Sequence, residues 1–252
     1  MPKTISTLFL VCFATVLRAQ VGDYRSDFAV GVNGGYVLSN ISFVPKVPQS
    51  MHTGLTGGLS FRYTSEKYFN SICAIVTEVN YSQIGWKESI LTPDDQPVIN
   101  SVTEQPEQYQ RDITYIQVPV LARMGWGREH RGFQFFFQVG PQFGLFLNED
   151  TKMNFAWEDR TPVRSDNTGR TSSCVAQDTM AVENKFDYGI AGGVGIEYSH
   201  PKVGHFLLEG RYYYGLGNIY GNSKRDYFGR SNFGNFVIKL SYLFDIIRTK
   251  KE

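Results

Sequence analysis

Eight segments of this chain alternate between apolar and polar side chains with a period of two residues. The segments are 28–38, 54–64, 72–84, 113–124, 133–147, 185–198, 205–216 and 234–244. In the sixth, Phe186, Tyr188 and Ile190 share one face, and Asp187 and Gly189 share the other. Because successive side chains of a β-strand point to opposite faces, each segment is predicted as a strand with one apolar face.

The connections between these segments alternate in length. They run over 39–53, 65–71, 85–112, 125–132, 148–184, 199–204 and 217–233. Every odd connection is long and every even one is short, as in outer-membrane barrels with long extracellular loops and short periplasmic turns. With an even number of strands, both chain termini are then expected in the periplasm.

The composition fits a sheet between lipid and a polar interior. The chain has 25 Gly, 15 Tyr and 19 Phe, yet its mean hydropathy is only −0.26. After the N-terminal segment, no stretch is apolar enough for a membrane helix, so a membrane protein of this sequence must be a closed barrel. We predict an all-β fold, a closed antiparallel up-and-down transmembrane β-barrel of about eight strands. The alternative fold is a soluble, lipocalin-like exported barrel, which needs a polar outer wall.

The N-terminus is predicted to be a secretory signal peptide. Lys3 is the basic region, 5–17 is the apolar region, and Leu17, Arg18 and Ala19 form an imperfect cleavage site. This divides the chain into a signal peptide over 1–19 and an outer-membrane barrel domain over 20–252.

Charge and cysteine content exclude several classes of function. Lys and Arg total 25 and Asp and Glu total 24, and no basic run forms a phosphate footprint, so we expect no nucleic-acid partner. Cys73 and Cys174 fall at opposite ends of the predicted barrel, so no disulfide is expected. No metal-ligand spacing is present around these two cysteines, and no metal or cofactor is expected.

The polar faces of the strands carry the main constellation of ionisable residues. Charge at the bilayer midplane is costly, so these faces must turn inward. The predicted polar network of the lumen comprises Arg62, Glu78, Arg123, Asp187, Glu197, Glu209, Arg211 and Lys239. One interpretation is a plug of paired charges that fills a narrow barrel, since buried charges need partners. The other is a polar channel that conducts or binds a small solute.

Aromatic residues and glycines support this arrangement. Aromatic rings near strand ends are expected at the lipid headgroup level; they are Tyr36, Tyr63, Tyr81, Trp86, Trp126, Tyr198 and Tyr214. Gly189, Gly193 and Gly195 are expected to leave room for bulky inward side chains of neighbouring strands. After the last strand, 245–252 is expected to be a short, solvated periplasmic tail.

A hydrolase needs a nucleophile, a base and usually an orienting acid. Of the four histidines, His130, His200 and His205 are placed at the short-turn end. Only His52 is expected near the outer rim, beside Ser50 and Thr53, and the sequence places no acid there. Cys174 has no neighbouring group to activate it and is interpreted as inert.

Four segments resemble the PorT-like outer-membrane β-barrel family of Bacteroidota. They are EVNYSQIGWK (78–87), YIQVPVLARMG (115–125), QVGPQFGLFL (138–147) and FDYGIAGGVGIEY (186–198). The resemblance runs in order over nearly the whole mature chain. It implies a porin-like barrel in the outer membrane of a Gram-negative cell. Most members of the family have no established activity, and some are associated with type IX protein secretion, a role that no residue here specifically supports.

The leading functional hypothesis is a non-enzymatic outer-membrane protein. It would act through its extracellular loops or as a subunit of an envelope or secretion complex, with membrane lipid as its other partner. The loops 85–112 and 148–184 are either a binding surface or a solvated shield. A narrow channel for small solutes is the first alternative, and an outer-membrane hydrolase is the weaker one.

Overall fold

The structure is a computed structural model that describes residues 23–68, 71–92, 94–100, 103–129, 131–155, 180–221 and 228–248. Its strands are β1 (Asp23–Val44), β2 (Gln49–Ser50), β3 (His52–Tyr68), β4 (Ser71–Ser89), β5 (Gln108–Gly127), β6 (Gly132–Met153), β7 (Phe186–His200), β8 (Gly204–Gly215) and β9 (Arg230–Ile247). Within these residues, no helix is long and apolar enough to cross a membrane. Each of the eight predicted segments lies within one of the long strands, apart from a residue at an end.

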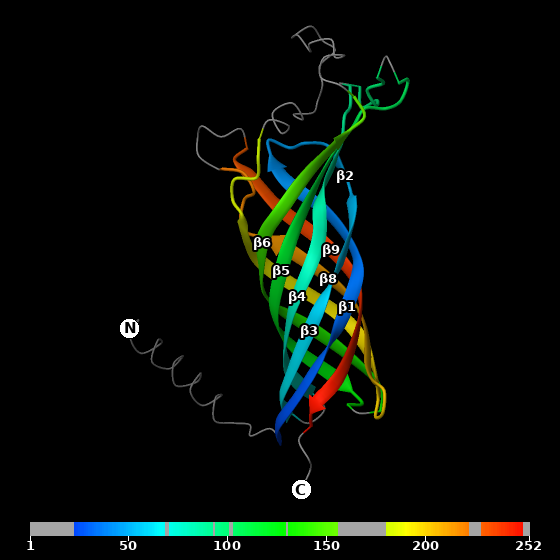
Figure 1. The fold of residues 1–252 in the computed structure, drawn as a ribbon, viewed down its shortest axis with the longest axis vertical. Helices are drawn as coiled ribbons and strands as arrows, with labels where there is room; N and C mark the ends of the chain where they lie inside the picture. Colours follow the sequence, from blue (N-terminus) through cyan, green and yellow to red (C-terminus); the bar gives the residue numbers. More distant parts are fainter. Residues whose placement is uncertain are drawn as a thin grey trace, which may run out of the picture.

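The eight long strands form a closed antiparallel barrel (Figure 1). Chain neighbours pair with each other, and the ring closes where β1 pairs with β9. This seam runs from Phe28 opposite Ile247 to Val44 opposite Arg230. The short β2 adds two further pairs to β4. Closure leaves no open sheet edge around the barrel wall, so backbone groups there bond to neighbouring strands.

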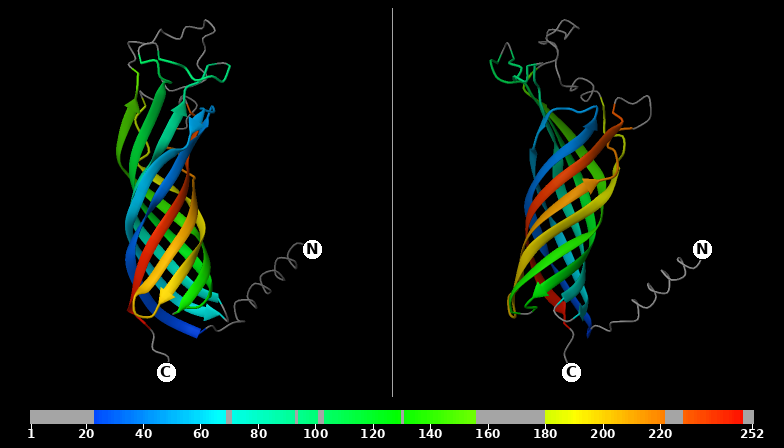
Figure 2. Two further views of the ribbon diagram at one scale, coloured as in Figure 1. Left: turned by 90° about the vertical axis from the view of Figure 1, so that its right-hand side faces the viewer. Right: turned by 180° about the vertical axis from the view of Figure 1, so that it is seen from behind.

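The two ends of the barrel differ (Figures 1 and 2). One end, which we call the terminal end, contains the start of β1, the end of β9 and the short turns after β3, β5 and β7. At the other end, which we call the loop end, β4 ends at Ser89, β5 begins at Gln108, β8 ends at Gly215 and β9 begins at Arg230, so the long connections start and finish there. The predicted alternation of connection length is therefore confirmed.

From the terminal end upward, the wall is apolar outside. Val194 and Leu240 leave 66% and 65% of their surface exposed, which a protein surrounded by water would not select as a continuous band. Other exposed apolar residues of this band are Val32, Leu55, Leu59, Ile75, Val79, Phe135, Phe137, Val139, Ile190, Leu208 and Ile238. The soluble-barrel alternative required a polar outer wall, and the structure does not have one at this level.

Polarity reverses toward the loop end. On β4, Ile84 and Trp86 are fully buried inside the barrel, whereas Gln83 on the outer face is exposed. On β6, Asp150 and Lys152 are exposed. A wall that is apolar inside and polar outside suits water, so the strands continue beyond the lipid-facing band. Because the strands extend past the band, the connection between β4 and β5 is 90–107, which is shorter than the predicted 85–112.

Replacing Leu240 by Arg should destabilise the folded barrel by about 2–4 kcal/mol, because the charge would lie within the apolar band. The measurement is urea unfolding of the protein folded into lipid vesicles. Val203→Arg in the turn between β7 and β8 is the control, and it should cost about 0–1 kcal/mol. Equal costs at the two sites would contradict the assigned lipid-facing band.

Candidate functional site

The lumen contains a first charge network at the terminal end, centred on Glu197 of β7. Arg62 of β3 donates to both carboxylate oxygens of Glu197, at 2.8 and 2.9 Å. Arg123 of β5 also pairs with Glu197. Glu197 is 1% exposed, and two guanidinium groups supply the partners that a buried carboxylate needs.

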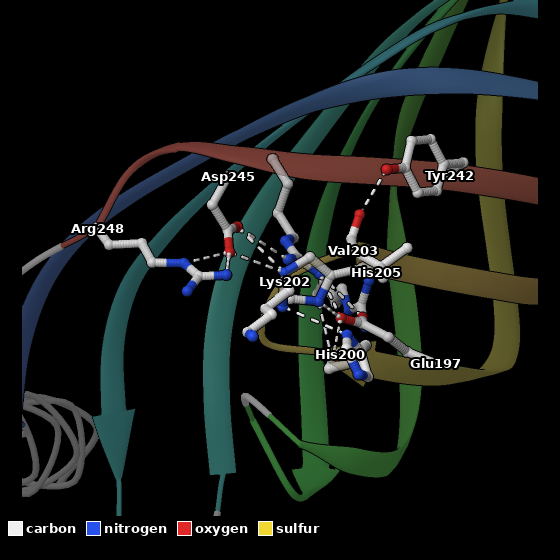
Figure 3. Close-up of polar contacts among 11 residues, drawn as sticks. Glu197, His200, Lys202, Val203, His205, Tyr242, Asp245 and Arg248 are labelled. Carbon is white, nitrogen blue, oxygen red and sulfur yellow. Dashed lines mark hydrogen bonds and ion pairs between the residues drawn. The ribbon is translucent and has the colours of Figure 1, made fainter.

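His205 extends this network to the last strand (Figure 3). Its Nδ1 lies 2.7 Å from Glu197 Oε1, and its Nε2 lies 3.0 Å from Asp245 Oδ2. Arg248 pairs with the same Asp245 at 2.7 Å. The expected solvated tail from Asp245 is therefore wrong at its start, since β9 continues to Ile247 and Asp245 turns into the barrel mouth.

A second charge network lies deeper in the lumen. Arg211 of β8 donates to both oxygens of Glu78 on β4, at 2.9 and 3.0 Å. Arg211 also pairs with Glu209 at 2.7 Å. Lys239 of β9 contacts Glu78 and lies 3.4 Å from Glu209. Two acids and two bases thus offset each other, and all four side chains are buried.

Asp187, the eighth predicted residue, lies apart from both networks. It is buried, and Tyr213 of β8 donates a hydrogen bond of 2.6 Å to it. The other seven predicted residues lie in the two charge networks, whereas Asp187 is held by a tyrosine rather than a base.

Glycines make room for these inward side chains. A Cβ on Gly189 would lie 2.8 Å from the Tyr213 hydroxyl, and a Cβ on Gly195 would lie 2.5 Å from the Phe136 ring. The Phe136 ring packs 3.8 Å from the guanidinium carbon of Arg123. A larger residue at either glycine would displace a side chain that supports the lumen.

Toward the loop end the lumen is filled by aromatic side chains. Phe43, Trp86, Tyr220 and Phe228 form what we call the aromatic plug. Ring centroids are 4.6 Å apart for Phe43 and Phe228, and 5.4 Å apart for Phe43 and Trp86. Trp86 was expected at the headgroup level, and this expectation is wrong because its ring points inward and is fully buried. Tyr36, Tyr81, Trp126, Tyr198 and Tyr214 are exposed on the outer wall.

The structure adds a serine and an acid to His52, which the sequence could not. Ser39 Oγ lies 3.2 Å from His52 Nδ1, and Asp112 Oδ1 lies 2.6 Å from His52 Nε2. However, Ser39 Oγ also donates to the carbonyl of Gly85 at 3.0 Å and accepts from its N–H at 2.9 Å. Ser39 is 1% exposed. The contacts among Ser39, His52 and Asp112 therefore link β1, β3 and β5, and Ser39 also binds the backbone of β4.

Asp112 lies beyond the lipid-facing band, on the polar outer face of β5. Partial burial acts to raise its pKa. Hydrogen bonds from Lys152 at 2.6 Å and Gln110 at 2.7 Å, together with His52, outweigh burial and lower the pKa below its usual value. The ionised carboxylate of Asp112 therefore links β5 to β3 through His52 and to β6 through Lys152 at the loop end.

Two other predictions concern cysteines and histidines. Cys73 is a free thiol, half-buried at the terminal end. Cys174 and His130 lie outside the described residues, and so does the predicted signal peptide over 1–19. The absence of a disulfide and the cleavage site therefore stay predictions.

The family described as "Outer membrane protein beta-barrel domain" matches residues 18–221 of this sequence. The chain belongs to this family. Family membership and the closed, outwardly apolar barrel place this protein in the outer membrane, in contact with lipid. No curated protein matches it in sequence.

Solved structures of outer-membrane proteins are similar to this barrel. OprG from Pseudomonas aeruginosa is 16% identical, over 88% of this chain and 98% of that chain, with a TM-score of 0.42. Neisserial surface protein A is 10% identical, over 86% and 97%, with a TM-score of 0.40. Ail, the attachment invasion locus protein of Yersinia pestis, is 12% identical, over 86% and 98%, with a TM-score of 0.35. Likeness at this level carries no inference about activity.

In this outer-membrane barrel, Glu78→Gln should destabilise the fold by about 3–5 kcal/mol, because Arg211 and Lys239 would then share only Glu209. Urea unfolding in lipid vesicles measures the loss. Glu183→Gln is a matched control on an exposed residue, with an expected change within about 0.5 kcal/mol. A Glu78 variant as stable as the control would show that the second network does not support the barrel.

Proposed function

We propose that this protein is a non-enzymatic, PorT-like outer-membrane barrel whose filled lumen makes it an anchor rather than a channel. It acts through its loop-end surface or as a subunit of an envelope or secretion complex. The observation that carries this proposal is the sequence of side-chain layers across the lumen: two charge networks and, above them, the aromatic plug.

Each layer reduces the space for a solute. At the terminal mouth, a cavity of about 30 Å³ lies among Arg62, Glu197, His205 and Asp245, which is the volume of about one water molecule. In the second network, Glu78 and Lys239 are 2% and 1% exposed. Acids and bases there bind each other across the lumen, so neither a water-filled path nor an uncompensated charge for attracting ions is expected. This argues against the alternative of a narrow solute channel.

The proposal that the barrel is not an enzyme rests on the surroundings of the two serines that lie beside histidines, Ser39 beside His52 and Ser199 beside His205. Each serine hydroxyl lies beside a histidine nitrogen and also beside another acceptor. Ser39 Oγ lies 3.2 Å from His52 Nδ1 and 3.0 Å from the Gly85 carbonyl oxygen. Ser199 Oγ lies 2.8 Å from His205 Nδ1 and 3.1 Å from Glu197 Oε1. A general-base mechanism needs the serine proton directed to the histidine, and the second acceptor competes for that proton. Both serines are also 1% exposed.

The loop end supplies the surface for partners. Its outer face is polar, and β4, β5 and β6 carry it beyond the lipid-facing band. With both termini in the periplasm, this extension lies outside the cell, where adhesive or assembly contacts are made. The segments 78–87, 115–125, 138–147 and 186–198 support the PorT-like assignment and an origin in Bacteroidota.

Purified protein in planar bilayers should give no stable stepwise conductance. The lumen is closed at several levels, so thermal motion of a single side chain cannot open it. A trimeric porin reconstituted in parallel is the positive control. A reproducible, long-lived open channel would overturn the proposal in favour of solute transport.

The orientation is tested by labelling single cysteines in intact cells with a membrane-impermeant maleimide. In a Cys73→Ser, Cys174→Ser background, Gln105→Cys at the loop end should react in intact cells. Lys202→Cys at the terminal end should react only after the outer membrane is broken. Reaction of Lys202→Cys in intact cells, with protection of Gln105→Cys, would place the termini outside.

A further inference from the structure

The outer wall of the barrel has a groove near the terminal end, with a volume of about 510 Å³. It crosses the wall from β1 over β9, β8 and β7 to β6. Among its lining residues are Val32, Gly34, Leu240, Leu208, Tyr198 and Phe133. The strand register sets two neighbouring rows of outward side chains, with Gly34 opposite Leu240 and Val32 opposite Tyr242. The groove follows these rows.

Gly34 is the reason that the groove is open at β1. A Cβ built there has one neighbour within 4 Å, the Thr56 carbonyl oxygen at 3.8 Å. Apart from Asn33 and Ser241, which are buried, the lining residues with side chains are aliphatic or aromatic and lie within the lipid-facing band. Hydrocarbon is therefore the chemistry that fits the groove, because a polar occupant would lose hydrogen bonds to water without replacing them.

The lower end of the groove meets a cationic rim. Phe133 and Tyr198 lie beside the turns between β5 and β6 and between β7 and β8, with ring centroids 5.0 Å apart. Arg128, Arg131 and Lys202 on these turns are exposed. The stretch 198–206 contains no acidic residue.

The turn that carries Lys202 is fixed to the groove wall. The hydroxyl of Tyr242 donates a hydrogen bond to the carbonyl of Val203 (Figure 3). On the neighbouring turn, the acidic residue Glu129 is paired with Lys67 at 3.6 Å. The rim is therefore positive at the level of the lipid headgroups, directly beside the lower end of the apolar groove.

We propose that this groove holds one anionic phospholipid, with an acyl chain along Gly34 and Leu240 and the phosphate against Lys202 and Arg131. The site rests on the barrel spanning the outer membrane, and the proposed orientation assigns it to the periplasmic leaflet, where phospholipid is found. Charge complementarity selects an anionic headgroup over a zwitterionic one, since each basic residue near the membrane surface attracts anionic lipid.

Native mass spectrometry of the full-length protein tests the site, with dioleoylphosphatidylglycerol and dioleoylphosphatidylcholine added in equal amounts. The protein should retain one phosphatidylglycerol in preference to phosphatidylcholine. Lys202→Glu and Arg131→Glu should each lower this preference by about fivefold or more. Gly34→Leu should fill the groove and lower the retention of both lipids.

Two matched variants control for general effects. Gly192→Leu places the same side chain at another outward glycine, where a Cβ would meet only ordinary contacts at 3.8 and 3.9 Å. Lys46→Glu makes the same charge change at the loop end. Both should retain phosphatidylglycerol as the unaltered protein does. Heat-modifiable electrophoretic mobility, which reports barrel folding, should be unchanged in all variants.

Equal retention of the two lipids, or the same loss in Gly192→Leu as in Gly34→Leu, would overturn the proposal. A dimer that Gly34→Leu dissociates would assign the groove to a second copy of the chain and also overturn it. The closed lumen is measured separately by conductance, so failure of the lipid site leaves the proposed anchoring function intact.

Discussion

Closure of the sheet by the β1–β9 seam is the constraint on which the rest of the structure depends. In hydrocarbon, an unpaired strand edge leaves N–H and C=O groups without water, at a cost of several kcal/mol for each group. Once the ring is closed, every strand has one face toward lipid and one toward a narrow lumen. Ionisable side chains then have only the lumen available, and they must find partners there.

The filled lumen follows from this constraint and from the small size of the barrel. Eight strands enclose an interior just wide enough for side chains to fill it. Glu78 and Glu197 each accept from two basic residues that come from different strands. These contacts cross-link the wall from inside. The anchor-like function proposed for the protein is therefore a consequence of how the charges are accommodated.

The reversal of polarity along the strands divides the molecule into two environments. In the apolar band, Leu240 points outward and Lys239 inward; toward the loop end, Trp86 points inward and Gln83 outward. The first arrangement suits lipid, and the second suits water. The part of the barrel beyond the band thus resembles a soluble sheet with its own aromatic core, and it can present a polar surface for partners.

The sequence was sufficient for the number of long strands, the faces within the apolar band and the alternation of longer and shorter connections, because alternation with a period of two is a local property. It predicted that Glu78 and Arg211 face inward. It could not predict that they pair, because 133 positions separate them and the contact depends on strand tilt and register around the ring. It also missed the role of Asp245, since a strand that continues past its last aromatic residue has no local signal. It missed the role of His205 because the two acids beside this ring come from β7 and β9.

Trp86 shows a different limit. It continues the alternation of β4, but the face that is apolar has changed, so a prediction that assumed one polarity along the whole strand placed the ring outside. Only the level of the membrane boundary decides this, and that level is set by the assembled barrel. A switch of polarity between Tyr81 and Ile84 was nevertheless present in the sequence and could have indicated it.

The most direct test of the central claim is fluorescence quenching by phospholipids with brominated acyl chains, in variants that retain one tryptophan. Trp126 alone (Trp86→Phe, Trp157→Phe) should be strongly quenched, because its ring is exposed on the lipid-facing wall. Trp86 alone (Trp126→Phe, Trp157→Phe) should keep its fluorescence, because its ring is sealed in the lumen. Quenching of Trp86 with protection of Trp126 would contradict the assignment of the two faces.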